Sequence, residues 1–138
     1  DEDASGNLFL IINASDLRKL KPSGEPDPNF GFGGVVSLDW TPTDMAITSD
    51  GKIVTSGARY LPGTFDRRYS IVRRYHADGS SDIKFGRLGY AYLAIDTESA
   101  SRKLFIDSDG SFLIIGYCAL NGTRQAGFVA RVFGARKL

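Results

Sequence analysis

Histidine, cysteine, methionine and tryptophan each occur only once among the 138 residues of this chain. A zinc site built from several histidines is therefore excluded. A Ser-His-Asp triad is close to excluded, because His76 precedes an Asp-Gly turn, where we expect an exposed loop residue. The single Cys118 excludes an internal disulfide, and its apolar neighbours predict a buried, inert thiol. No hydrophobic run approaches the roughly 18 residues of a membrane helix, so we expect no membrane span.

The chain also has no large excess of positive or negative charge, since its net charge is +1. This near-neutrality argues against a nucleic-acid partner. The charges are nevertheless uneven: residues 1–66 hold ten acidic and five basic side chains, and residues 67–138 hold six and twelve. Because the chain starts at Asp1 and its one methionine is Met45, we expect a processed or excised piece. The sequon at residues 121–123 fits a secreted or cell-surface protein.

Glycine and aromatic residues are plentiful, with sixteen glycines, nine phenylalanines and six tyrosines. Many of them lie in internal repeats. Residues 24–34 and 79–89, which start 55 residues apart, both read G-x-x-D-x-x-F-G-x-x-G. A second pattern around an Asp-Gly pair occurs in residues 48–57 and 107–116, with a weaker copy in residues 4–13. Repeats of this length indicate a solenoid or a propeller.

The repeats also predict strands. The Asp-Gly pairs lie between alternating apolar and polar runs, which predicts β-hairpins with type I′ turns. Apolar-basic runs align through Arg18, Arg73 and Arg131. No window shows sustained helical periodicity, so we expect an all-β chain with about four strands per repeat. The ten expected strands cover residues 7–13, 16–21, 34–39, 44–48, 52–58, 69–75, 90–95, 102–106, 111–118 and 127–133.

Repeats of four antiparallel strands are typical of β-propeller blades. We expect a single all-β domain of about two and a half blades: a partial blade in residues 1–40, a full one in 41–97 and a partial one in 98–138. Phe30 and Phe85 are expected to insert between blades while the adjacent glycines let the backbone turn. The preceding aspartates, Asp27 and Asp82, are expected to accept hydrogen bonds from backbone N–H groups in the turn.

The pattern resembles the delta-60 repeat, an NHL-like propeller family, over roughly residues 16–134. The matching residues are Asp50, Gly51, Lys52, Ile53, Gly57, Arg74, Tyr75, Asp78, Gly79, Ser80, Asp82, Phe85, Gly86 and Gly89. The other structural repeat residues are Asp27, Phe30, Gly31, Gly34, Asp109 and Gly110. The first unit lacks the Asp-Gly-Lys start and the third stops before the Phe-Gly motif. The resemblance implies the repeat type and a propeller, and implies no activity.

Few residues indicate chemistry, and we expect no enzyme, cofactor or metal. No phosphate-binding loop is present. Residues 107–111 are similar to a calcium loop, but Cys118 stands where the twelfth-position acid would be, so a turn explains them better. Two charged sets are expected to be solvated; the alternatives are acid-base chemistry for the acidic set and contact with an acidic partner for the basic set. The acidic set, expected in turns or loops, is Asp39, Asp44, Asp66, Asp96 and Glu98, and the basic set is Arg67, Arg68, Arg73, Arg74, Lys84 and Arg87.

Loop aromatics and arginines make up the expected binding set: Trp40, Tyr60, Phe65, Arg67, Arg68 and Tyr92. Tyr69 and Tyr90 lie near them, and packing between blades is the favoured alternative for Trp40 and Tyr90. Three functions remain open. The first is a non-catalytic binding or structural propeller. The second is a propeller lectin, disfavoured because the loops in residues 55–68 and 115–126 differ. The least favoured is a propeller hydrolase or lyase.

The expected strand count leaves an incomplete sheet at each end of the chain. Such edges need a partner. We therefore expect copies of this chain, or the remainder of a larger propeller, to complete the assembly, with other proteins or glycans as further possible partners. The acidic first half and the basic second half favour head-to-tail contact.

Overall fold

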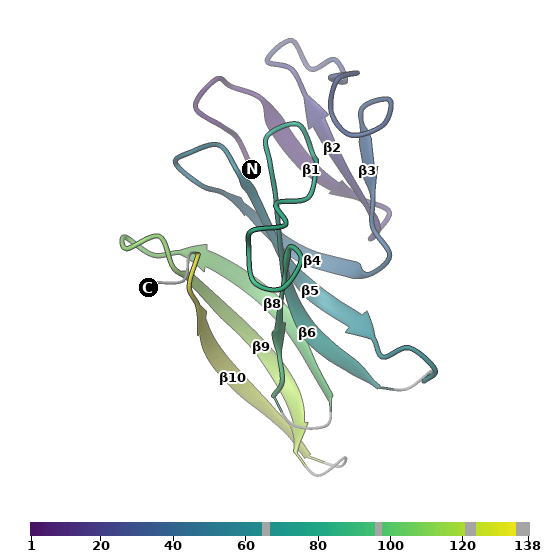
Figure 1. Ribbon diagram of the computed structural model, residues 1–138, viewed down its shortest axis with the longest axis vertical. Coiled ribbons are helices and arrows are strands. Elements are labelled where there is room, and N and C mark those ends of the chain that lie inside the picture. Colours follow the sequence, from purple (N-terminus) through teal and green to yellow (C-terminus); the bar gives the residue numbers. More distant parts are fainter. Residues whose placement is uncertain (65–66, 96–97, 121–123, 135–138) are drawn as a thin grey trace.

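The computed structural model describes residues 1–64, 67–95, 98–120 and 124–134. Within these residues the regular secondary structure consists of strands alone, arranged in three small antiparallel sheets (Figure 1). The first sheet contains β1 (Leu8–Ile12), β2 (Asp16–Leu20) and β3 (Val35–Ser37). The second contains β4 (Thr41–Ile47), β5 (Ile53–Tyr60), β6 (Arg68–Tyr75) and β7 (Tyr90–Leu93). The third contains β8 (Glu98–Ile106), β9 (Phe112–Leu120) and β10 (Arg124–Val132).

The all-β prediction is confirmed, and ten strands lie near the ten predicted positions. In the described residues only the second sheet has the expected four strands; the first and third have three each. β8 begins at Glu98, four residues before its predicted start, because residues 98–101 pair with β9. β3 is shorter than predicted, since Gly34 belongs to the preceding turn with φ 88°.

Five turns share one geometry, and their glycines are Gly6, Gly24, Gly51, Gly79 and Gly110. Each glycine N–H donates to the carbonyl oxygen three residues earlier at 2.8 to 3.0 Å, and each φ lies between 76° and 88°. Asp50 and Asp109, which precede two of these glycines, are not at positive φ. The predicted type I′ geometry is therefore wrong here: a type I turn followed by one left-handed glycine needs positive φ at a single position.

Type I′ turns occur instead in the F-G-x-x-G motifs. The central residues have φ of 61° and 88° at Gly33 and Gly34, and of 55° and 89° at Leu88 and Gly89. Two residues earlier in the second motif, a Cβ at Gly86 would collide with the carbonyl oxygen of Tyr90. Glycine is therefore required at Gly86 for space as well as for its φ of 56°.

The aspartates of the same motifs hold their loops in two ways. Asp27 and Asp82 each accept a hydrogen bond from the backbone N–H two residues later, at 3.1 and 3.2 Å. Asp27 also forms an ion pair with Lys19 at 3.3 Å, and Asp82 forms one with Arg74 at 2.9 Å. Both ion pairs join a strand to the loop eight residues later along the chain. The loops are therefore tied to β2 and β6 by the same kind of contact.

Strand register corrects the alignment through Arg18, Arg73 and Arg131. The third residue after each turn glycine is Phe9, Val54 or Leu113, and their cross-strand partners are Lys19, Arg74 and Arg131. Arg131 therefore corresponds to Arg74 and not to Arg73. The one-residue difference matters because it moves the side chain to the opposite face of its sheet.

The three sheets stack face to face around two apolar cores. The first core lies between the first and second sheets and includes Phe9, Phe30 and Ile53. The second lies between the second and third sheets and includes Val54, Phe85 and Phe112. Phe30 and Phe85 are 0% and 1% exposed, and each makes an edge-to-face ring contact with a centroid distance of 5.9 Å. Each motif phenylalanine thus fills the space between its own sheet and the next.

Candidate functional site

The second sheet extends beyond the first at one end. β5 and β6 have eight residues each, whereas β1 and β2 have five each. The register of the two hairpins starts at equivalent residues, so the extra length lies at the end where β5 leads into β6. On the face toward the first sheet, this end carries Arg59 opposite Tyr69. In the first sheet the pairing of β1 with β2 ends at Ile12 and Asp16, before the position equivalent to Arg59 and Tyr69.

Arg59 and Tyr69 belong to a group that we call the tyrosine shelf, made of Asp39, Arg59, Tyr69, Tyr90 and Tyr92. The rings of Tyr90 and Tyr92 on β7 are stacked, with centroids 5.8 Å apart and an interplanar angle of 5°. Tyr69 meets Tyr92 edge to face at 5.0 Å. The shelf is therefore an ordered aromatic surface that does not need to form on binding.

Charge on the shelf is balanced locally. Asp39 forms ion pairs with Arg59 and, at 4.0 Å, with Arg73, whose guanidinium lies 4.4 Å from the ring centroid of Tyr90. Burial lowers the pKa of Arg59, but the Asp39 carboxylate and the nearby phenols outweigh burial and raise it. Burial raises the pKa of Tyr69. The shelf thus presents tyrosine rings and hydroxyls beside an arginine and an aspartate, a combination that suits sugars or polar protein surfaces.

The predicted binding residues do not form one site: Tyr60 and Arg68 are cross-strand partners, but Tyr92 lies on the other face of the sheet. Tyr92 is 45% exposed on the shelf, whereas Tyr60 lies one residue after Arg59 on β5 and thus on the opposite face of the sheet. Arg68, the cross-strand partner of Tyr60, also faces the third sheet, where Nε donates to Glu98 at 2.8 Å and Nη2 donates to the Tyr117 hydroxyl at 2.7 Å. The hydrogen bond with Glu98 raises the pKa of Arg68.

The remaining members of the set differ in position. Arg67 is exposed directly before β6, and Phe65 lies outside the described residues. The prediction that Trp40 is a binding residue is wrong, because its side chain is only 5% exposed and belongs to the first core. Gly57 makes room for it: a Cβ there would lie 2.9 Å from Cζ3 of Trp40. Trp40 is thus a packing residue, as the alternative interpretation had it.

Two arginines expected on a solvated face are enclosed instead. The side chains of Arg73 and Arg74 are 16% and 12% exposed. Arg74 donates to Asp82 and, through Nη1, to the carbonyl oxygen of Gly134 at 2.7 Å. Burial raises the pKa of Asp82, but the charge and hydrogen bond of Arg74 outweigh burial and lower it. The prediction of solvation failed because alternation along β6 places both of its faces between sheets.

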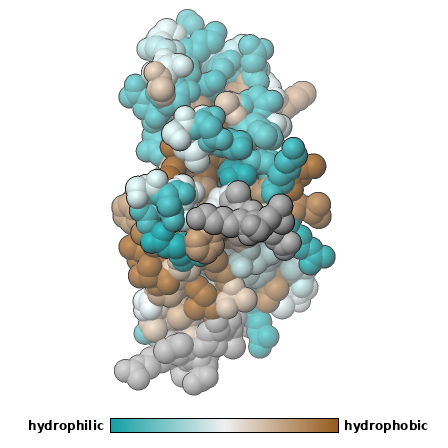
Figure 2. Space-filling view, turned by 60° about the vertical axis from the view of Figure 1, so that its left-hand side comes forward, coloured by the Kyte–Doolittle hydropathy of each residue, from teal (hydrophilic) through white to brown (hydrophobic). Residues whose placement is uncertain are grey.

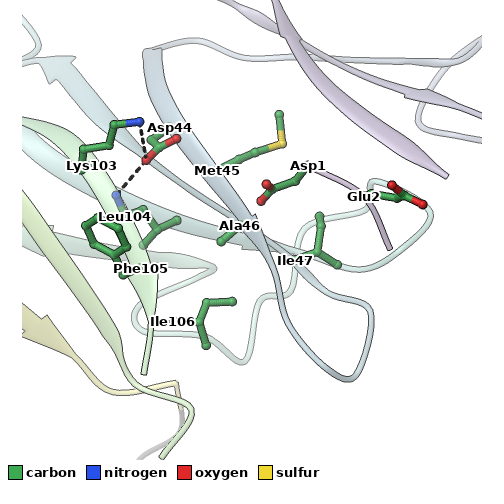
Figure 3. Close-up of a pocket in the computed structure, with 10 residues that line it drawn as sticks. All are labelled: Asp1, Glu2, Asp44, Met45, Ala46, Ile47, Lys103, Leu104, Phe105 and Ile106. Atoms are coloured by element: carbon green, nitrogen blue, oxygen red, sulfur yellow. Dashed lines mark hydrogen bonds and ion pairs between the residues drawn. The ribbon is translucent and has the colours of Figure 1, made fainter. Parts of the chain in front are cut away.

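Two acidic residues expected in turns lie on strands. Glu98 begins β8, and Asp44 lies on β4 just after a register shift. Asp44 Oδ2 accepts a hydrogen bond from the backbone N–H of Leu104 at 2.9 Å and lies 3.7 Å from Nζ of Lys103 (Figure 3). These contacts join β4 to β8 beside an open hollow of about 520 Å³, which Asp1 and Glu2 also line. Asp66 and Asp96 lie outside the described residues.

A second hollow, of about 650 Å³, lies between two equivalent turns, residues 48–52 of the second sheet and 107–111 of the third. It is lined by charges of both signs, including Asp50, Lys52 and Arg74. In the part of the chain that the structure describes, no three His, Cys, Asp or Glu side chains lie close enough together to hold a metal ion. The second hollow thus combines aspartates from two equivalent turns with basic side chains.

Sequence reasoning missed a polar contact between the second and third sheets. Ser56, Ser70, Ser99 and Ser101 are all buried there. The backbone N–H of Ser70 donates to the Ser99 hydroxyl at 2.9 Å, and the hydroxyls of Ser70 and Ser101 are hydrogen-bonded. The only signal was the presence of serines within the strands, and it does not reveal that they meet.

Two sheet faces are not covered by any other part of the chain that the structure describes. On the outer face of the first sheet, Leu8 and Leu10 are exposed, and on the outer face of the third sheet Phe105, Ile115 and Val129 are exposed. Figure 2 shows hydrophobic residues gathered in the lower half of one side, at the height of β8–β10, and hydrophilic residues above. We call these surfaces the first outer face and the third outer face.

The comparisons with known proteins add no relative. No family model, no curated protein and no solved structure matches the chain. Among the described residues, no helix is long and apolar enough to cross a membrane.

Proposed function

We propose that the chain is a run of β-propeller blades that serves as a non-catalytic binding or structural module. The observation that carries this proposal is the position of Phe30 and Phe85. They are 55 residues apart, and each fills the core between one antiparallel sheet and the next. Sheets that stack in chain order through the same motif are what blades require. The delta-60 resemblance supports the same architecture.

The blades would be residues 1–40, 41–97 and 98–138, with the second one complete. In this arrangement β4 and β8 are the innermost strands, and the contact of Asp44 with Lys103 and Leu104 faces the axis. A crystal structure of the purified chain tests the proposal. The strands β4 and β8 should lie nearest a common axis, with β3 and β7 farthest from it. A closed sandwich without such an axis would contradict it.

A lectin is the second candidate, and the tyrosine shelf favours it. Stacked tyrosines beside a carboxylate and an arginine suit sugar rings and hydroxyls. Against it, the shelf occurs once among the described residues, because Ala14 and Cys118 stand at the position of Arg59 in the first and third sheets and Val35 stands at that of Tyr90 in the first. A repeated lectin site would need the same groups in each blade.

A glycan array separates the two candidates. The proposal predicts no glycan bound above background by the wild-type chain. The variant Tyr92→Ser removes an exposed shelf ring, and Phe105→Ser removes a similarly exposed ring from the third outer face. A glycan that binds the wild type and Phe105→Ser but not Tyr92→Ser would replace the module proposal with the lectin.

A further inference from the structure

The two outer faces correspond, residue by residue, to faces that are packed inside the molecule. Counted from the turn glycines, Leu8 and Leu10 of the first sheet occupy the positions of Ile53 and Thr55 in the second. Ile53 and Thr55 are 0% exposed, since their face is covered by the first sheet. Leu8 and Leu10 are 40% and 37% exposed. The first outer face is therefore equivalent to a face that takes a neighbouring sheet.

The third outer face is equivalent to the other side of the second sheet. Counted from the turn glycines, Ile115 occupies the position of Ser56. Because Val129 is the cross-strand partner of Ile115 and Val72 is that of Ser56, Val129 occupies the position of Val72. Val72 is 0% exposed against the third sheet, whereas Val129 is 69% exposed. The same apolar residue type thus stands at the same position, buried in one sheet and open in the other.

We infer that the third outer face of one copy of the chain docks on the first outer face of a second copy. This inference rests on the proposed function, because it extends the stacking of the three sheets by one more contact of the same kind. Leu8 and Leu10 of one copy would cover Ile115 and Val129 of the other, as Ile53 lies against the sheet that precedes it.

Charge favours the same pairing. The first outer face belongs to the half of the chain with ten acidic and five basic residues, and the third to the half with six and twelve. Lys103 and Arg131 lie on the third outer face, where Arg131 is paired with Asp107 at 2.8 Å. The first outer face carries Asp16 and Arg18, and Asp1 and Glu2 pair with β1 beside it. Opposite charge around an apolar centre orients two surfaces and disfavours pairing of like faces.

The two faces differ, so the contact is head to tail, and it closes into a ring or propagates as a filament according to the rotation between copies. This property allows a complementation experiment. The variant Val129→Arg blocks the third outer face, and Leu10→Arg blocks the first. Both positions are partly or largely exposed, so each variant should fold, which circular dichroism and a thermal melt verify. Ile83→Arg is the control, because Ile83 is 67% exposed in a loop outside both faces.

Sedimentation equilibrium at about 100 µM then measures the molar mass of each protein in solution and tests the inference. Wild type and Ile83→Arg should form multiples of 15.0 kDa, and Val129→Arg and Leu10→Arg should each be monomers. An equimolar mixture of those two variants should form a one-to-one dimer and nothing larger, because only one competent pair of faces remains. A monomeric wild type, self-association of either variant alone, or a mixture that stays monomeric would overturn the inference. These results are independent of the crystallographic test of the blades, because that test depends on the position of β4 and β8.

Discussion

Replacement of Phe85 by alanine tests the packing between the second and third sheets. Phe85 is 1% exposed, makes an edge-to-face contact with Phe112 at 5.9 Å, and lies 4.8 Å below the guanidinium carbon of Arg74. Truncation of a buried phenylalanine costs about 3–5 kcal/mol. Arg74 stays paired with Asp82, so its charge is not left alone. We therefore expect Phe85→Ala to lower the free energy of unfolding by about 4 kcal/mol.

Urea denaturation measures this change. With an m-value of about 1.5 kcal/mol per M, a loss of about 4 kcal/mol moves the midpoint down by between about 2 and 3 M. Leu88→Ala is the matched control, since Leu88 lies in the same motif but is 71% exposed. Its effect should stay within about 0.5 kcal/mol. If Phe85→Ala also stays within that range, Phe85 does not hold the two sheets together and the reasoning fails.

Two further predictions concern strain and pH. Leu88→Gly should stabilise the chain by roughly 0.5–1 kcal/mol, because Leu88 has φ 55° where the first motif has Gly33; a lower urea midpoint than wild type would refute this. Asp82 has a lowered pKa in the folded state, so it stabilises the fold above the ordinary carboxyl pKa of about 4, and this contribution is lost as the pH falls through the lowered value. Asp82→Asn should therefore be less stable than wild type at pH 7 and lose less stability between about pH 5 and 2; equal losses in urea melts across that range would contradict the role of the ion pair with Arg74.

Local features could be predicted because they depend on neighbours in the chain. Strand alternation placed ten strands near their observed positions, and glycine occupies most positions with positive φ, with Asn13, Ala14 and Leu88 as the exceptions among the described residues. The repeat made Phe30 and Phe85 the expected buried residues, since a large ring among glycines has no local role. The same logic misjudged the Asp-Gly turns, where hydrogen bonds select a type I turn with one left-handed glycine.

The tertiary structure decided which side of each strand is covered. Alternation divides β6 into two faces, but it does not say that both lie between sheets and that Arg73 and Arg74 are therefore enclosed. The tertiary structure also separated Tyr92 from Arg68, and it placed Trp40 over Gly57 in the core. The sequence by itself determined the approximate strands, the positions of the turns and the repeat, because these follow from backbone conformation and side-chain period. Burial and partners required the tertiary structure, because a side chain's environment is set by the sheet that packs against it, and that sheet comes from a distant part of the chain.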